Sequence, residues 1–166
     1  SERNLELQKK ARCFVERPKS VEGISKAVQS RTFYFDPTYV VKEDLKDHQG
    51  HVFARKGSKF NPLEIVSLSQ NLIFFDGDDQ EQKVWVQQRF AKNTDTKPLR
   101  LILIKGAPLK LAEALNIPVY FDQGGFLTRK LGIKHVPAVV SQEGLQLKIE
   151  EMVLPPSREL KREEVP

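Results

Sequence analysis

The chain has 166 residues, of which 39% are hydrophobic and 30% charged, and this composition indicates a globular protein with one domain and a smaller accessory element. No apolar run is long enough to span a bilayer, so membrane insertion is not expected. The net charge is +5, but Lys and Arg are interleaved with Asp and Glu, whereas phosphate binding needs a clustered basic patch. Direct nucleic-acid binding is therefore not expected.

The first 30 residues predict a helix and a connector. Residues 2–17 are rich in Glu, Lys, Arg and Leu, which favours a helix that ends before Pro18. Residues 18–30 are polar and contain Pro and Gly, which indicates a connector with a short helical piece at 24–28.

Short β-rich runs separated by turns predict a small β-rich element over residues 31–70. A strand at 32–35 leads into the turn Asp36-Pro37. Asn61-Pro62 then requires an extended or turn geometry at Asn61, because a proline ring disfavours the helical region for the residue before it. We expect the chain to reverse there into the next domain.

Strands and helices alternate over residues 71–153, which predicts an α/β domain. Asp78 or Asp79 is expected to cap a helix at 80–91, in which Trp85 has helical spacing with its apolar neighbours. Further helices are expected at 109–115 and 126–131, and strands at 72–75, 99–104, 119–121, 138–140 and 145–151. The tail 154–166 is Pro-rich and charged, and is predicted to be disordered.

The order of these elements resembles a thioredoxin-like domain that lacks its redox motif. A strand ending at Asp122, a glycine turn, a short helix and Val136-Pro137 follow one another, and in thioredoxin-like domains the equivalent proline is preceded by a cis peptide. The expected position of the Cys-x-x-Cys motif contains Gly106-Ala107-Pro108-Leu109. Because Cys13 is the one cysteine of the chain, an attacking and a resolving sulfur are not both present.

A surface beside Pro137, with Gly106 and Pro108, is therefore predicted to bind a protein segment, and plain packing is the alternative. Tyr120 is expected to point toward a partner, since strand alternation places it opposite its two neighbours; burial on both faces of the sheet is the alternative. Asp122 and Gln123, which follow that strand, complete the candidate partner surface.

No metal or cofactor is predicted. The acidic run Asp76–Asp79 has oxygen ligands but lacks the ligand spacing of a calcium loop, and a helix cap explains it more simply. His48 and His51 lack a third ligand, and no serine elbow or phosphate loop is present. The sequence thus predicts a protein that is not an enzyme.

Together, the motifs between Phe33 and Glu151 resemble the TraW family of F-type conjugative type IV secretion systems. In this comparison Asp36, Pro37, Asn61, Pro62, Asp78 and Trp85 are structural motif positions. The resemblance is carried by Phe35-Asp36-Pro37-Thr38, residues 47–57, Asn61-Pro62-Leu63, residues 76–79 with Gln82 and Trp85, Ile102-Leu103-Ile104 with Gly106, residues 119–123, Leu131-Gly132-Ile133 and Val136-Pro137-Ala138.

The resemblance implies a periplasmic protein, delivered by a signal peptide not included in this sequence, that acts in pilus assembly and mating-pair formation. It implies association with a TrbC-type pilus assembly protein and other type IV secretion subunits. The alternative is a thiol-dependent redox or chaperone-like protein in which Cys13 reaches the Pro137 surface from another chain.

Overall fold

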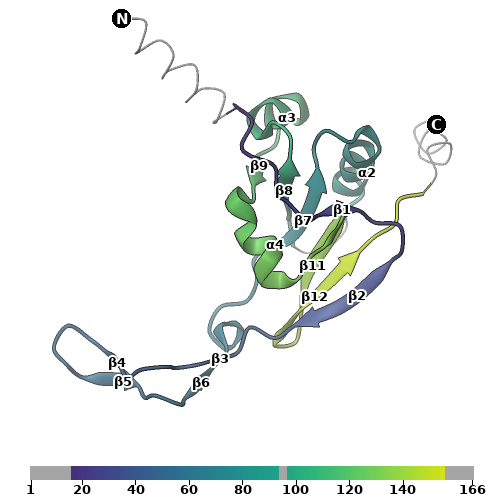
Figure 1. Cartoon of the computed structure of the whole chain (residues 1–166). Coiled ribbons are helices and arrows are strands. Elements are labelled where there is room, and N and C mark those ends of the chain that lie inside the picture. Colours follow the sequence, from purple (N-terminus) through teal and green to yellow (C-terminus); the bar gives the residue numbers. More distant parts are fainter. Residues whose placement is uncertain (1–15, 94–96, 156–166) are drawn as a thin grey trace, which may run out of the picture.

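A mixed six-stranded sheet forms the centre of the protein, in the order β2-β12-β11-β7-β8-β9 (Figure 1). The computed structural model describes residues 16–93 and 97–155. β7, β8 and β9 run parallel, whereas β11 pairs antiparallel with β7 and β12, and β12 pairs antiparallel with β2. The strands are β2 (Arg31–Phe35), β7 (Asn71–Asp76), β8 (Leu99–Lys105), β9 (Val119–Phe121), β11 (Ala138–Glu143) and β12 (Gln146–Glu151). The strands predicted beyond residue 71, and the α/β class, are confirmed.

Both faces of the sheet are covered, and each has its own apolar core. On one face, α2 (Gln80–Ala91) and α3 (Pro108–Leu115) contribute Val86, Trp85 and Leu111 to a cluster with β7 and β8. On the other face, α4 (Phe126–Leu131) packs with β2 and β12 through a second cluster. The three predicted helices are confirmed, and burial on both faces explains the continuous apolar run of β8.

The N-terminal segment lies against this domain in an extended conformation. Residues 18–30 contain β1 (Ser25–Lys26), which pairs parallel with β10 (His135–Val136). The helical piece expected at 24–28 is therefore wrong, because backbone hydrogen bonds to β10 replace local helical ones. The predicted helix at 2–17, with Cys13, lies outside the described residues except for its last two positions. Of the predicted tail, only 154 and 155 are described, and Leu154 is buried.

A β-arm, residues 36–61, projects from the body between β2 and β7 (Figure 1). Two separate ladders form it, one between β3 and β6 and one between β4 and β5. Since β2 belongs to the central sheet, only part of the predicted β-rich element 31–70 stands apart. The arm strands are β3 (Tyr39–Val40), β4 (Leu45–Lys46), β5 (Val52–Ala54) and β6 (Lys59–Phe60), and the short helix η1 (Pro62–Glu64) follows.

None of the helices in the described ranges is both long and apolar enough to cross a membrane.

Candidate functional site at the carboxyl edge of the sheet

The parallel strands β7, β8 and β9 end at one edge of the sheet, which we call the carboxyl edge. Open α/β sheets bind ligands in the crevice outside this edge. Here the crevice is crossed by residues 17–28, which we call the strap. The strap begins beside Asp78, passes the end of β8 and the start of α4, and reaches β10.

Backbone hydrogen bonds hold the strap along its length. The Val21 N–H donates to the Ile104 carbonyl at 2.8 Å, and the N–H groups of Ser25 and Ala27 donate to carbonyls of the loop and strand around β10 at 3.1 and 2.9 Å. Its inward side chains occur at every third position, with Pro18 and Ala27 buried and Val21 and Ile24 half-buried. The strap therefore fills the crevice as a segment added beside β10.

Val21 lies over a position that only glycine can occupy without a clash. A Cβ atom at Gly125 would lie 2.7 Å from Val21 Cγ1, and Gly125 has a φ of +68°. The missing side chain at Gly125 thus makes the space for Val21.

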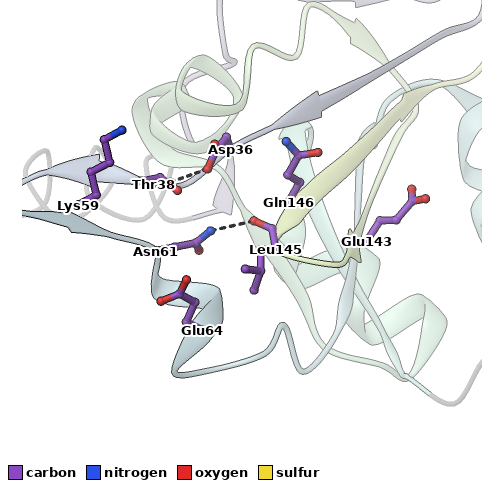
Figure 2. Close-up of a pocket in the computed structure, with 8 residues that line it drawn as sticks. All are labelled: Asp36, Thr38, Lys59, Asn61, Glu64, Glu143, Leu145 and Gln146. Atoms are coloured by element: carbon purple, nitrogen blue, oxygen red, sulfur yellow. Dashed lines mark hydrogen bonds between the residues drawn. The ribbon is translucent and has the colours of Figure 1, made fainter.

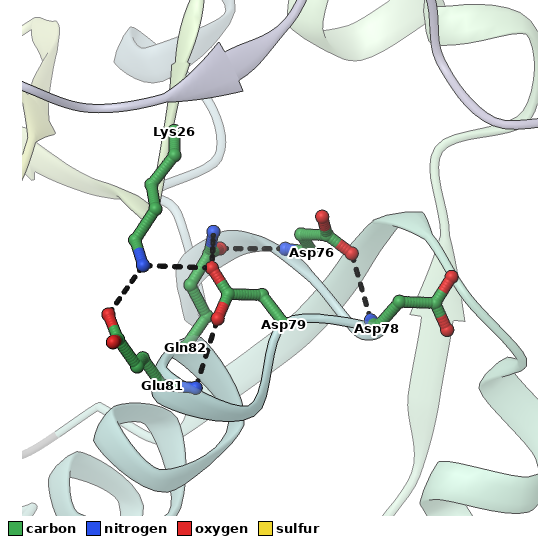
Figure 3. Close-up of polar contacts among 6 residues, drawn as sticks. All are labelled: Lys26, Asp76, Asp78, Asp79, Glu81 and Gln82. Atoms are coloured by element: carbon green, nitrogen blue, oxygen red, sulfur yellow. Dashed lines mark hydrogen bonds and ion pairs between the residues drawn. The ribbon is translucent and has the colours of Figure 1, made fainter. Parts of the chain in front are cut away.

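The acidic turn Asp76–Asp79 joins β7 to α2 at the same edge (Figure 3). Asp79 caps α2, since its side chain accepts from the Glu81 N–H at 3.0 Å and from Gln82 Nε2 at 3.0 Å. The Asp78 N–H donates to Asp76 Oδ1 at 2.8 Å, and buried Gln82 accepts from the Asp76 N–H at 2.8 Å. The predicted cap is confirmed at Asp79, while Asp78 faces the strap.

Cations of the strap pair with this turn. Lys26 Nζ lies 3.1 Å from Asp79 Oδ2 and also pairs with Glu81. The Arg17 guanidinium forms a bidentate ion pair with the Asp78 carboxylate, with both N···O distances at 3.2 Å. The hydrogen bond to Glu81, opposed by partial burial and helped by Asp79, raises the pKa of Lys26. Burial acts to raise the pKa of Asp79, but the bonds from Lys26 and Gln82 outweigh it and lower that pKa. Charge complementarity therefore fixes the strap above the start of α2.

Within the described residues, no three His, Cys, Asp or Glu side chains are grouped so that they could hold a metal ion.

Four of the six predicted partner residues are buried. Pro137 follows a cis peptide bond and lies directly after β10, the strand covered by the strap. Gly106 and Pro108 are both buried, and a Cβ at Gly106 would lie 3.2 Å from Gly77 backbone atoms. The expectation of an open surface beside Pro137 is therefore corrected: the strap of the same chain occupies that side.

Asp122, the fourth buried residue, has an internal role. Its carboxylate accepts from the N–H groups of Leu127 and Thr128 and from the Thr128 hydroxyl, at 3.0, 3.0 and 2.8 Å. These contacts close the turn at the start of α4, so the carboxylate does not face outward.

Tyr120 and Gln123 are the two exposed members of the predicted set. Tyr120 is 45% exposed on the edge strand β9, with the Arg100 guanidinium 4.6 Å from its ring centre. The predicted outward direction of Tyr120 is confirmed, and its contact with a partner stays a prediction. Gln123 lies in the adjoining short helix η2 (Gln123–Gly125).

A second hollow, of about 630 Å³, lies where the arm meets the body (Figure 2). Buried Asn61 accepts from the Leu63 N–H at 2.9 Å and donates to the Leu145 carbonyl at 3.0 Å, which confirms the predicted turn at Asn61-Pro62. At the start of the arm, Asp36 accepts from the Thr38 N–H at 2.9 Å. Contacts of the Thr38 hydroxyl and N–H lower the pKa of Asp36. The hollow is lined by Asp36, Thr38, Lys59, Asn61, Glu64, Glu143, Leu145 and Gln146.

The strap was missed by the sequence analysis, although a signal exists. Pro18, Val21, Ile24 and Ala27 repeat with a period of three, which fits neither a helix nor a regular strand. This period is typical of an extended segment in contact with a surface along one side.

These features define a mixed α/β protein with a projecting arm and a carboxyl edge closed by its own chain. It is similar to Protein TraW of Escherichia coli (strain K12), with 38% identity over 125 residues, which is 75% of this chain and 58% of that relative. The matched region belongs to the TraW family, and the chain spans a little over half the length of this relative. No family model matches the chain, and no solved structure matches it.

Proposed function

We propose that the protein is a non-catalytic, periplasmic assembly factor of an F-type conjugative type IV secretion system, which acts by docking to other transfer subunits in pilus assembly and mating-pair formation. The observation that carries the proposal is the 38% identity to a TraW protein. The name of that relative supports a role in conjugative transfer, and the partner we propose is a TrbC-type pilus assembly protein.

A thioredoxin-like body is part of the proposal. The arrangement that supports it is β7, α2 and β8 followed by the cis Val136-Pro137 bond and the hairpin of β11 and β12. Because β7, and not β8, adjoins β11, the redox motif of such a body corresponds to Asp76–Asp79 rather than to Gly106–Leu109. The carboxylates of that turn cap α2 and form ion pairs with the strap.

The arm supports docking on energetic grounds. Tyr39, Val40, Leu45 and Val52 are between 39% and 52% exposed. Two-stranded hairpins are only marginally stable in water, and exposed apolar side chains on them gain stability when a partner covers them. We therefore propose the arm as a main docking contact and Tyr120 as a second one.

Calorimetry with the purified full chain and a TrbC-type protein tests the proposal. Saturable binding is expected, with an affinity lowered by Tyr120→Ala. No binding at high micromolar concentration contradicts the choice of partner. The thiol-dependent alternative is separated by Cys13→Ser, which keeps the affinity if the protein is a docking subunit and loses function if the thiol is required.

A further inference from the structure

The carboxyl-edge crevice holds a piece of extended polypeptide. Its partners are backbone groups around β10 and at the end of β8, the space above Gly125, and the carboxylates at the start of α2. These are the features by which a surface binds an extended peptide: main-chain bonds give affinity, and spaced side chains give selectivity.

The selectivity of the crevice follows from the strap side chains. Val21 enters the space above Gly125, and a hollow of about 250 Å³ adjoins this position beside Gly124 and Arg129. Five residues further on, Lys26 is placed between the Asp79 and Glu81 carboxylates. The crevice therefore selects an apolar residue and, five positions later, a basic one.

The contacts that hold the strap are individually weak. The side chains of Arg17 and Lys26 are 59% and 41% exposed, and exposed ion pairs contribute little to stability. The paired strand β1 has only two residues. The apolar contacts of the strap come from four inward side chains, of which Val21 and Ile24 are only half-buried. Segments with so few buried apolar contacts open locally, at a lower free energy than global unfolding.

We propose that the strap occupies a peptide-binding site of its own chain and that an extended, basic segment of a partner protein displaces it. The segment pairs parallel with His135–Val136, places an apolar side chain above Gly125, and puts a Lys or Arg between Asp79 and Glu81. Charge complementarity argues for this occupant, since the turn and the first residues of α2 present acidic groups to whatever lies in the crevice. The inference rests on the proposed docking function and specifies one site for it.

Hydrogen exchange on the full chain tests whether the strap opens. The amide protons of Val21, Ser25 and Ala27 are expected to exchange at least about 100-fold faster than those of β8, and faster still in 1 M salt, because salt screens the Lys26 pairs. If these three amide protons exchange at the same rate as those of β8, the strap opens only on global unfolding and the proposal is overturned.

A peptide with the sequence of residues 17–28 tests the crevice itself. The full-length Lys26→Glu variant is expected to bind the labelled peptide about tenfold more tightly than the wild type does, because its own strap is repelled by Asp79 and Glu81. A peptide with Glu at the position of Lys26 should not bind. The control is Lys19→Glu. The Lys19 side chain is 81% exposed and, among the described ion pairs, pairs only with Glu22, so this variant should bind the peptide with the affinity of the wild type.

Absence of saturable peptide binding by a Lys26→Glu protein with a native circular dichroism spectrum contradicts the proposal. This assay contains no transfer subunit, so its result is separate from the test of the proposed function. Binding of a TrbC-type protein with equal affinity to the wild type and to Lys26→Glu would leave docking intact and reject the crevice as its site.

Discussion

The Arg31 guanidinium at the start of β2 donates two hydrogen bonds, of 2.7 and 3.1 Å, to the buried Glu151 carboxylate at the end of β12. Glu151 Oε2 also accepts from the N–H groups of Lys134 and His135, at 2.8 and 3.0 Å. One carboxylate therefore links an edge strand of the sheet to the segment that enters β10.

Glu151→Gln is expected to lower the free energy of unfolding by about 2 kcal/mol, because it removes the charge from a set of hydrogen bonds made in a buried site. Urea denaturation measures the loss. The matched control is Glu150→Gln, on the same strand, whose carboxylate makes only a 3.9 Å pair with Lys148 among the described ion pairs. Equal effects of the two substitutions would contradict the assigned role of Glu151.

The stability of the protein should fall in acid through the same carboxylate. Burial acts to raise the pKa of Glu151, but the bonds from Arg31, Lys134 and His135 outweigh it and lower the pKa below its ordinary value of about 4.5. A lowered folded-state pKa stabilises the fold above pH 4.5, and this contribution is lost as the pH falls through the lowered value. Between pH 7 and pH 3, the free energy of unfolding should fall more steeply for the wild type than for Glu151→Gln. Parallel curves of unfolding free energy against pH would contradict this assignment to Glu151.

Gly125→Ala should destabilise the protein by about 1 kcal/mol more than Gly124→Ala does. The two glycines have φ values of +68° and +69°, so the backbone cost of adding a Cβ atom is alike, but only the Gly125 Cβ meets Val21. Thermal denaturation of both variants isolates the contact with the strap. Val21→Ala combined with Gly125→Ala should recover the difference, and no recovery would place the clash elsewhere.

Asp122→Ala should cost about 2–3 kcal/mol in unfolding free energy, because two backbone N–H groups and the Thr128 hydroxyl lose their acceptor in a buried turn. The neighbouring control Gln123→Ala changes an exposed side chain and should cost less than 0.5 kcal/mol, roughly the effect of an ordinary surface substitution. If Asp122→Ala keeps the stability of the wild type but loses affinity for a partner, the carboxylate is a contact residue after all.

Val40→Glu in the arm should weaken binding to the transfer partner about tenfold and leave the melting temperature unchanged. Lys59 lies directly opposite Val40 in the arm ladder, so the new carboxylate faces a cation and the ladder is kept. The control Leu109→Glu places the same charge at a side chain that is 59% exposed on α3. Calorimetry should separate the two variants, and equal affinities would argue against the arm as a docking contact.

The elements beyond residue 71 could be predicted because their information is local. The apolar run of β8, the cap at Asp79 and the proline at the start of α3 each determine their own structure within a few residues. The sequence marks Asp122 as a candidate partner residue. Its actual role depends on the Leu127 and Thr128 N–H groups, which donate to its carboxylate only when the turn closes.

The strand at 32–35 and the turn at Asn61-Pro62 could also be predicted from local sequence. The placement of residues 18–35 on the body could not be predicted, because the contacts that determine it are distant in sequence. Lys26 meets Glu81 and Arg31 meets Glu151, across 55 and 120 residues. Only the pairing of β1 with β10 and of β2 with β12 reveals that residues 18–35 belong to the body.

The arm leaves the body after Asp36 and returns at Asn61, and both residues line the same hollow. Its described strands pair only with one another, so the register of the central sheet does not depend on how many residues lie between these two points. Insertions or deletions in the arm would therefore change how far the proposed docking contact reaches without disturbing the sheet. If the arm binds a partner as proposed, the span between the two proteins can be adjusted independently of the fold.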